Sequence, residues 1–421
     1  MDRRAFLTAT VAVPFMDASK ALAQAPLKLP ALAWTQWGGP NRNFQTEARG
    51  LKDTWPAAGP RVVWKRPLGD GYSSPAVENG VLYVMYGKPR EEVVMAADTE
   101  TGKTLWEHAT PMTFQSDAAR EMGNGPYSTP LVAGTRVFTT GVAGRLQCLD
   151  KKTGKVLWTQ QLWDEHRGSQ MMYGYASSPI AFRELVIVPV GGRGKAVMAF
   201  QQADGKVAWA KGNLGNVYSS PILINVSGLE QLAVLLDGAL IAVNPHNGDP
   251  QWQVPFTADY SIAVATPVWG PDNLLFVSSE YNAGTKVIEL KRNGLQTTAT
   301  ELWSSNRLRL HHGNAMRIGP TIYFSNGGKG SQAILTAVDA RSGKIHWQER
   351  SIQKATFVWA DNKLITLDQD GNLMIAHPSP AGFKISATAS LLTNLSWSPP
   401  TLVGTKLYIR DRKSLMAVEL G

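Results

Sequence analysis

The stretch Leu149-Asp150-Lys151-Lys152-Thr153-Gly154-Lys155-Val156-Leu157-Trp158 decides the fold, because its pattern recurs along the chain. An Asp at the start of a turn accepts hydrogen bonds from backbone N–H groups two residues on, and Gly adopts the left-handed conformation that such turns need. Asp150 and Gly154 therefore predict a hairpin, and Trp158 lies on the strand that leaves it. We expect this Trp to cover the apolar gap to the neighbouring unit, where an indole can bury about 150–250 Å².

The unit that ends with this stretch begins at Tyr127-Ser128-Thr129-Pro130, with two small polar residues before a Pro. Similar starts recur, each followed by alternating strands and, in most copies, by an Asp-Gly or Asn-Gly turn and a Trp. The starts lie at 72–75, 127–130, 177–179, 219–221, 265–267, 313–315, 355–357 and 397–400. Each unit of about 40–55 residues has the size of one propeller blade.

Eight copies predict an all-β fold, an eight-bladed β-propeller of four-stranded antiparallel blades. The seventh copy is degenerate near Phe383-Lys384-Ile385, and a seven-bladed ring is the alternative if this copy is not a blade. The eighth copy ends at Leu420 without its last strand and its Trp. The segment Arg61–Lys65, which contains Trp64, supplies the missing strand. Pairing it into the last blade closes the ring and removes two free sheet edges.

The N-terminus has the pattern of an export signal. Arg3-Arg4 precede an apolar run from Phe6 to Met16, and Ala21-Leu22-Ala23 provides small residues for cleavage. We therefore expect a twin-arginine-type signal peptide over residues 1–23 and a periplasmic or extracellular protein. Residues 24–60 are expected to form an N-terminal extension that packs on the propeller, which spans residues 61–421. No later stretch approaches twenty apolar residues, so no transmembrane span is expected.

The composition excludes several classes of protein. The formal net charge is +9, but the chain has no run of five Lys or Arg and no nucleic-acid motif, so we expect no nucleic-acid partner. Cys148 is the only cysteine, which excludes an intrachain disulfide and a paired-cysteine metal site. Its alternating apolar surroundings predict a buried small hydrophobe. We expect a monomer.

The repeat Asp-x-x-Thr-Gly-Lys-x-x-Trp resembles the tryptophan-docking repeat of quinoprotein alcohol dehydrogenases and of the assembly factor BamB. The segment Trp34-Thr35-Gln36-Trp37-Gly38-Gly39-Pro40-Asn41-Arg42, with Gly71-Tyr72-Ser73-Ser74-Pro75, resembles the opening of exported bacterial PQQ-like repeat proteins. The resemblance covers residues 34–420. It implies the propeller fold and leaves the function open, because this group is named for its repeat.

The resemblance also names a cofactor, pyrroloquinoline quinone (PQQ). In the dehydrogenases of this type, the quinone lies between a Trp and a disulfide of adjacent cysteines, beside a calcium ion, with an Asp as base. Cys148 stands alone here, and no motif of this chain matches the calcium ligands or the base. We assign no catalytic or metal-binding residue and expect a non-catalytic binding or protein-interaction scaffold. The alternative is a PQQ-dependent oxidoreductase that lacks the disulfide.

The candidate binding residues lie where the chain enters the first strand of each repeat. This position is aromatic or basic in most copies. The candidates are Tyr72, Tyr127, Tyr175 (beside Ala176), Tyr218, His312, Lys354 and Trp397. In a propeller they would ring one mouth of the central channel, where aromatic rings suit a sugar, a quinone or a peptide. The alternative is that they pack between blades. The expected partner is an unidentified envelope protein or a small ligand that uses this channel face.

Overall fold

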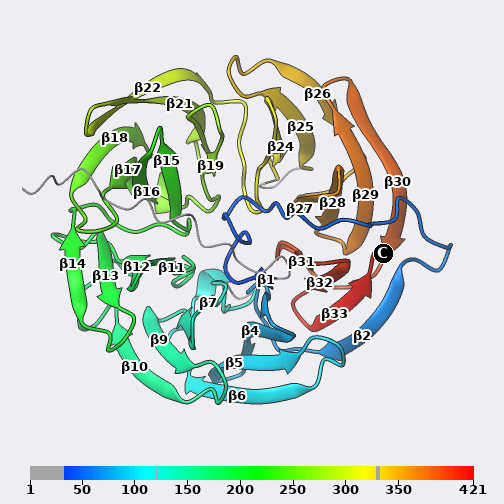
Figure 1. Ribbon diagram of the computed structural model, residues 1–421, viewed down its shortest axis with the longest axis horizontal. Helices are drawn as coiled ribbons and strands as arrows, with labels where there is room; N and C mark the ends of the chain where they lie inside the picture. The colour runs from blue at the N-terminus through cyan, green and yellow to red at the C-terminus, as the bar shows by residue number, and fades with distance from the viewer. Residues whose placement is uncertain (1–32, 120, 329–331) are drawn as a thin grey trace, which may run out of the picture. The chain divides into compact units, whose positions relative to one another are not determined.

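The computed structural model shows eight antiparallel sheets arranged in a ring (Figure 1). It describes residues 33–119, 121–328 and 332–421, so the predicted signal peptide lies outside the described residues. In every sheet except the one that contains β2, the strand that comes first in the chain lies innermost and the last lies on the rim. The prediction of an eight-bladed all-β propeller is confirmed.

The strands follow the chain blade by blade. Blade one contains β3 (Ala76–Glu78), β4 (Val81–Lys88), β5 (Glu91–Asp98) and β6 (Thr104–Pro111), with β1 (Ala33–Trp34) added beside β3. Blade two contains β7 (Leu131–Ala133), β8 (Arg136–Thr140), β9 (Arg145–Asp150) and β10 (Val156–Gln161). Blade three contains β11 (Ile180–Phe182), β12 (Leu185–Pro189), β13 (Val197–Gln201) and β14 (Val207–Lys211). Blade four contains β15 (Ile222–Val226), β16 (Leu229–Leu236), β17 (Gly238–Val243) and β18 (Pro250–Phe256).

The second half of the chain repeats this arrangement. Blade five contains β19 (Val268–Trp269), β20 (Leu274–Ser279), β21 (Gly284–Asn293) and β22 (Gln296–Ser305). Blade six contains β23 (Met316–Ile318), β24 (Thr321–Asn326), β25 (Ile334–Asp339) and β26 (Ile345–Glu349). Blade seven contains β27 (Ala355–Ala360), β28 (Lys363–Asp368), β29 (Asn372–Ser379) and β30 (Gly382–Ser390), so the degenerate seventh copy is a full blade. Two short 3-10 helices, η1 (Asp117–Ala119) and η2 (Asp259–Ser261), lie in loops between blades.

Blade eight joins the two ends of the chain. It contains β31 (Thr401–Val403), β32 (Lys406–Arg410), β33 (Ser414–Glu419) and, as its rim strand, β2 (Arg61–Pro67). The register runs from Arg61 opposite Glu419 to Pro67 opposite Ser414. The predicted closure of the ring by the segment around Trp64 is therefore confirmed.

The turn chemistry of the repeat is visible in blade two. Oδ1 of Asp150 accepts hydrogen bonds from the backbone N–H and the hydroxyl of Thr153, at 2.9 and 2.8 Å. Gly154 has a φ of +70°, and a Cβ on it would overlap the ring of Trp106 from blade one. The indole N–H of Trp106 donates to the carbonyl of Lys151 at 3.1 Å. In most blades the Trp thus donates to the hairpin of the following blade and covers it, as the repeat predicted.

Two positions in the ring depart from this pattern. Trp252 of blade four donates to Oε1 of Gln231, within its own blade, at 2.7 Å. Blade seven has Ala387 on β30, where other blades have the Trp, opposite Ile375. There Trp55, from the N-terminal segment, donates to the carbonyl of Thr388 on β30 at 3.2 Å. An indole therefore reaches blade seven from another part of the chain.

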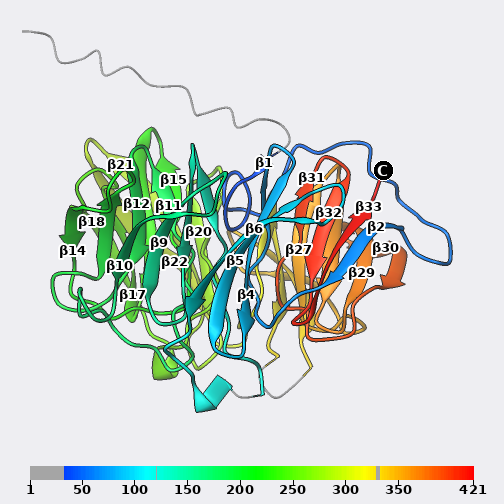
Figure 2. The same ribbon diagram turned by 90° about the horizontal axis from the view of Figure 1, so that it is seen from below.

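The N-terminal segment enters the middle of the ring before it reaches β2 (Figures 1 and 2). Arg42 is its most buried charged residue, with 4% of its surface exposed. The guanidinium donates to the carbonyls of Ser178, Pro179 and Pro221, which precede the innermost strands of blades three and four. Burial lowers the pKa of Arg42 to about 9. Residues 33–45 thus form a plug fastened to the inner strands.

Among the described residues, no helix is long and apolar enough to cross a membrane.

Candidate functional site

The loops that connect one blade to the next converge on a single cavity on the ring axis. Its volume is about 180 Å³, and its lining comes from the N-terminal plug, from seven of the eight loops between blades and from the hairpin between β20 and β21. The aromatic lining residues are Trp37, Tyr72, Tyr127, Tyr173, Tyr218, Tyr281 and Trp397, together with His311 and His312. We call this cavity the aromatic cup.

The wall of the aromatic cup is a continuous row of ring contacts. Tyr72 stacks on Tyr127 at 6.2 Å between centroids and on Trp397 at 5.4 Å. Trp397 contacts His312 at 4.6 Å, and His312 stacks on His311 at 3.9 Å. Such contacts between rings contribute free energy beyond that gained by burying their apolar surface. The faces of these rings are therefore held in fixed positions around the cup.

The plug contributes Trp37 to the cup. Its indole N–H donates to the hydroxyl of Thr266, in the loop before blade five, at 2.9 Å. Its ring also packs edge-on against Phe44 at 5.3 Å. Figure 2 shows the N-terminal segment on the face of the ring opposite the loop between β6 and β7. The cup is therefore closed by the plug at one end and faces the loops at the other.

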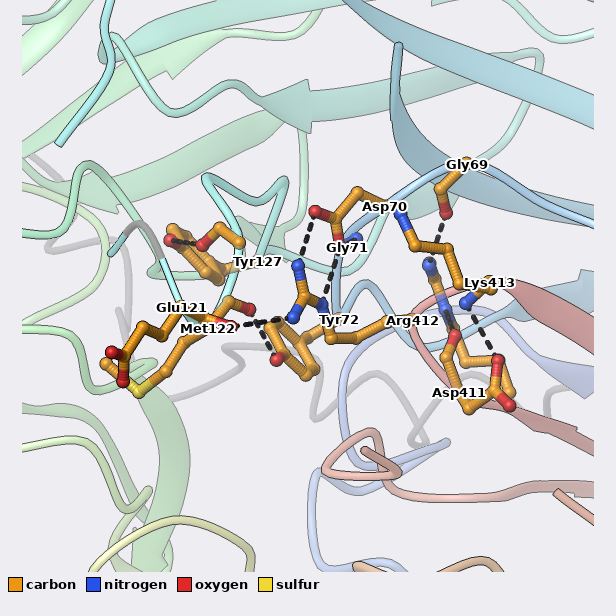
Figure 3. Close-up of polar contacts among 12 residues, drawn as sticks. Gly69, Asp70, Gly71, Tyr72, Glu121, Met122, Tyr127, Asp411, Arg412 and Lys413 are labelled. Carbon is orange, nitrogen blue, oxygen red and sulfur yellow. Dashed lines mark hydrogen bonds and ion pairs between the residues drawn. The ribbon is translucent and has the colours of Figure 1, made fainter. Parts of the chain in front are cut away.

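The long loop between β6 and β7 is fastened beside the cup (Figure 3). Tyr72 and Tyr127 donate their hydroxyls to the carbonyls of Met122 and Gly123, at 2.6 and 2.8 Å. Burial raises the pKa of both phenols, so both remain neutral donors. Since these hydroxyls are already bonded to the loop, the two tyrosines offer the cup their ring faces and not their polar tips.

Arg412 of blade eight anchors the same loop. Arg412 forms two hydrogen bonds with the carboxylate of Asp70, both at 2.8 Å, and donates a third to the carbonyl of Glu121 (Figure 3). The hydrogen bond with Asp70 raises the pKa of the guanidinium. This two-point geometry is the strongest form of an arginine–carboxylate contact. Arg412 thus joins three segments at the edge of the cup.

Burial lowers the pKa of two basic side chains at the cup, Lys354 and His312. Nζ of Lys354 lies 3.1 Å from Nδ1 of His311 and 5.0 Å from the centroid of Trp397. Burial lowers the pKa of Lys354 to about 8. Burial, with the nearby His311 and Lys354, holds the pKa of His312 well below its usual value, so His312 is neutral. In the part of the chain that the structure describes, no cluster of three or more His, Cys, Asp or Glu residues could hold a metal ion.

The structure brings most of the predicted site residues together. Tyr72, Tyr127, Tyr218, His312 and Trp397 all line the aromatic cup. Lys354 lies behind this wall, in contact with His311 and Trp397.

Tyr175 is placed differently from the sequence prediction. Its side chain is fully buried, and its hydroxyl donates to the carbonyl of Pro189 on β12 at 2.7 Å. It packs in the core of blades two and three and does not line the cup. The next tyrosine toward the N-terminus, Tyr173, lines the cup instead and contacts Tyr218 at 5.9 Å. In Tyr173-Gly174-Tyr175, the first tyrosine faces the axis because Gly174, with a φ of +89°, turns the chain between the two.

Trp37 and Tyr281 also line the cup, although neither lies at the repeat position. Trp37 lies in the Trp34–Arg42 segment, which resembles a family opening but gives no local sign of entering the ring. Tyr281 lies in the hairpin between β20 and β21, away from the repeat position at the start of each first strand. Its hydroxyl lies 3.2 Å from Nε2 of His311. Only the packing of distant segments brings these two residues to the cup.

The residues at the cup do not fit PQQ bound as the resemblance implies. PQQ is a polycarboxylate, and the described lining of the cup contains no Lys, Arg or Asn side chain. The nearby Arg412 is already bonded to Asp70. Cys148 is buried within β9, so it offers no sulfur to the cup, and burial raises the pKa of its thiol to about 12. We derive no reaction through a quinone.

Comparisons with known proteins agree with this repeat. The family model described as "Outer membrane protein assembly factor BamB" matches residues 190–380. The BamB of Yersinia pestis is 25% identical over 303 residues, which cover 68% of this chain and 72% of that protein. The quinohemoprotein alcohol dehydrogenase ADH IIB of Pseudomonas putida is 30% identical over 141 residues, which cover 32% of this chain and only 19% of the dehydrogenase.

Among solved structures, a europium-containing methanol dehydrogenase aligns with a TM-score of 0.67 at 14% identity. The alignment covers 92% of this chain and 89% of that one. At this identity the likeness concerns the fold. Repeat, fold and relatives agree that the chain is a β-propeller built from BamB-like, PQQ-type repeats.

Proposed function

We propose that this protein is a non-catalytic binding propeller, which takes an aromatic or apolar group of its partner into the aromatic cup. One observation carries the proposal: loops from seven blade junctions and the N-terminal plug build a single cavity lined by ring faces. Concave sites of this composition, on a rigid scaffold, are the usual ligand sites of proteins.

The size of the cup limits what it can take. Its volume of about 180 Å³ is below the roughly 300–1,000 Å³ of sites for whole small molecules. A single ring or one apolar side chain fits this space better than a large cofactor. The hydroxyls of Tyr72 and Tyr127 are bonded to the chain, so recognition relies on stacking and burial of apolar surface.

The size of the cup indicates the kind of partner, and the N-terminal pattern indicates the location. A cup for one side chain suits a protein or peptide partner, and one relative is named as an outer membrane protein assembly factor. The N-terminal pattern of Arg3-Arg4 and Ala21-Leu22-Ala23 supports export through a twin-arginine-type signal. We therefore place the protein in the periplasm or outside the cell, as a monomer that binds an envelope protein.

The test uses N-acetyl-tryptophanamide as a probe of the cup, followed by saturation-transfer NMR on the purified protein. We expect transfer to the indole protons with the wild type. Val264 lines the cup, and Val264→Trp should fill the space and abolish the transfer. The matched control is Tyr260→Trp, which places the same side chain in the same loop at a residue that is 73% exposed.

Two outcomes would contradict the proposal. One is equal transfer in the wild type and in Val264→Trp, with both proteins folded by circular dichroism. The other is loss of transfer in Tyr260→Trp as well. If Val264→Trp fails to fold, Ala176→Leu fills the cup from another loop with less added volume. The same two readouts then apply to that variant.

A further inference from the structure

A second, polar depression lies next to the aromatic cup. Its volume is about 530 Å³, and the residues that matter for its chemistry are Glu280, Asn306, Arg307, Arg309 and Asn326. We call it the arginine groove. It is built by the hairpin between β20 and β21, the loop between β22 and β23, and the end of β24.

The cup and the groove share one wall. Glu280 lines the groove, and the next residue, Tyr281, lines the cup. On the facing segment, Arg309 lines the groove and His311 lines the cup, with Leu310 between them. The backbone N–H of Glu280 donates to the carbonyl of Leu310 at 3.0 Å, which joins the two segments. A ligand only a few residues long can therefore reach both sites.

The groove holds one arginine in place and exposes another. Nε of Arg309 donates to the carbonyl of Asn306 at 2.6 Å, and its backbone N–H donates to Oδ1 of Asn326 at 2.7 Å. Nη1 of Arg309 lies 3.6 Å from Oε1 of Glu280. Arg307, two residues earlier, is exposed at the same groove. The groove thus has two guanidinium groups and one carboxylate, that of Glu280, so its charge is positive. The planar donors of a guanidinium suit the carboxylate of a ligand.

Glu280 is a carboxylate that lines the groove, and the residue is only 8% exposed. Its Oε1 faces Arg309, and its Oε2 is shielded from solvent. The contacts that the groove offers to a ligand therefore come from its arginines.

We infer that the cup and the groove together form one binding site for an acidic aromatic peptide: a segment that places an aromatic side chain in the cup and a carboxylate, one or two residues away, against Arg307 and Arg309. This inference rests on the proposed function of the cup and specifies the chemistry of its partner. The formal net charge of +9 on the whole chain favours the approach of an acidic partner.

The test compares peptides that differ only in charge. Acetyl-Trp-Gly-Glu-amide and acetyl-Trp-Gly-Gln-amide are titrated into the full-length protein, and binding is followed by isothermal calorimetry at low salt. We expect the acidic peptide to bind about tenfold more tightly, the size of effect that one charge-assisted contact gives. The advantage should shrink at high salt, because the groove is open to solvent.

The protein variants locate the contact. Arg307→Gln should remove most of the advantage of the acidic peptide and leave the neutral peptide unchanged. Arg193→Gln removes the same charge from an exposed residue between β12 and β13, and it should leave both affinities unchanged. Val264→Trp, which fills the cup, should abolish binding of both peptides.

The outcomes separate the two proposals. If both peptides bind equally to the wild type, or if Arg193→Gln acts like Arg307→Gln, the peptide inference is overturned while the cup can still bind indole. If neither peptide binds but N-acetyl-tryptophanamide does, the inference is likewise overturned and the cup stands. If none of the three compounds binds, both proposals fail.

Discussion

Glu92 shows how one buried carboxylate is placed where two blades meet. It lies on β5 of blade one with 6% of its surface exposed, and its Oε1 accepts a hydrogen bond from the N–H of Val142 at 2.8 Å. Its other oxygen lies against Gly141 of blade two, where a Cβ would overlap it. Burial raises the pKa of Glu92 to about 7. Ionisation of this carboxyl therefore opposes folding.

A pH-dependent difference should follow in Glu92→Gln, which keeps an oxygen for Val142 but cannot ionise. The unfolded chain releases the proton near pH 4.5, and the folded protein releases it near pH 7. The free energy of unfolding of the wild type should therefore fall relative to the variant as the pH rises from 4.5 to 7. Above pH 7 the variant should be more stable by up to about 3 kcal/mol, with no gain from this source below pH 4.5.

Urea unfolding at pH 4 and at pH 8 measures this difference. Glu91→Gln, at the exposed neighbouring residue, is the matched control and should show no such dependence on pH. A gain for Glu92→Gln that is equal at both pH values would contradict the assigned cause.

Individual residues of the cup were predictable only where they belong to the repeat. Tyr72, Tyr127, Tyr218 and Trp397 hold one repeat position, so their convergence follows from the symmetry of the ring. The exchange of Tyr175 for Tyr173 depends on the backbone turn at Gly174, which no repeat position encodes.

At the scale of strands, each blade has a register shift on its rim strand at the position that precedes the Trp or its substitute. In blade one, Trp106 is opposite Ala96 and Thr104 is opposite Ala97, so Leu105 is an extra residue. Leu105 is 55% exposed. Such bulges twist an edge strand and oppose edge-to-edge pairing between molecules. The same feature that directs the Trp inward thus protects the rim.

The docked Trp residues should contribute strongly to stability. Trp106→Ala removes the ring that covers Gly154 and leaves the carbonyl of Lys151 without its indole donor. Because the indole is only partly buried, we expect a loss of about 2–4 kcal/mol in the free energy of unfolding, measured by urea titration. Leu105→Ala, at the adjacent exposed residue, should change it by less than about 0.5 kcal/mol. Equal losses in both variants would contradict the docking role of Trp106.

The plug gives a second prediction at this scale. Arg42→Met removes the donor for the carbonyls of Ser178, Pro179 and Pro221, all of which are buried. Unpaired buried carbonyls are costly, so we expect a loss of about 2–4 kcal/mol and faster hydrogen exchange over residues 33–45. Arg49→Met, at an arginine whose side chain is 64% exposed, should change neither measurement. Unchanged exchange in Arg42→Met would show that the plug is held by other contacts.

The plug could not be predicted from the sequence. Arg42 contacts residues that are more than 130 positions away, and nothing in its neighbours distinguishes a plug from a surface strand. The blades were predictable because their hairpins are local and repeated: Asp150 and Thr153 make their contacts within one turn.

For the whole molecule, the chemistry of the cup predicts the response to PQQ. The described lining contains no Lys or Arg side chain for a polycarboxylate, and the single buried Cys148 excludes the disulfide of adjacent cysteines. Addition of PQQ with calcium should therefore leave the unfolding temperature unchanged, and no quinone absorbance should remain on the protein after gel filtration. A concentration-dependent rise in that temperature would favour the oxidoreductase alternative, because a ligand stabilises the state that binds it.

The pairing of β2 with β33 sets an order in time. During synthesis β2 emerges early, and its partner emerges only after the other seven blades. Contacts between such distant residues form slowly, so a nascent chain keeps the edge of β2 unpaired until β33 has been synthesised. Only a chain that has been extended through Ser414–Glu419 can complete the ring. A chain that stops before these residues therefore exposes β2 as an open sheet edge, which can pair with other chains.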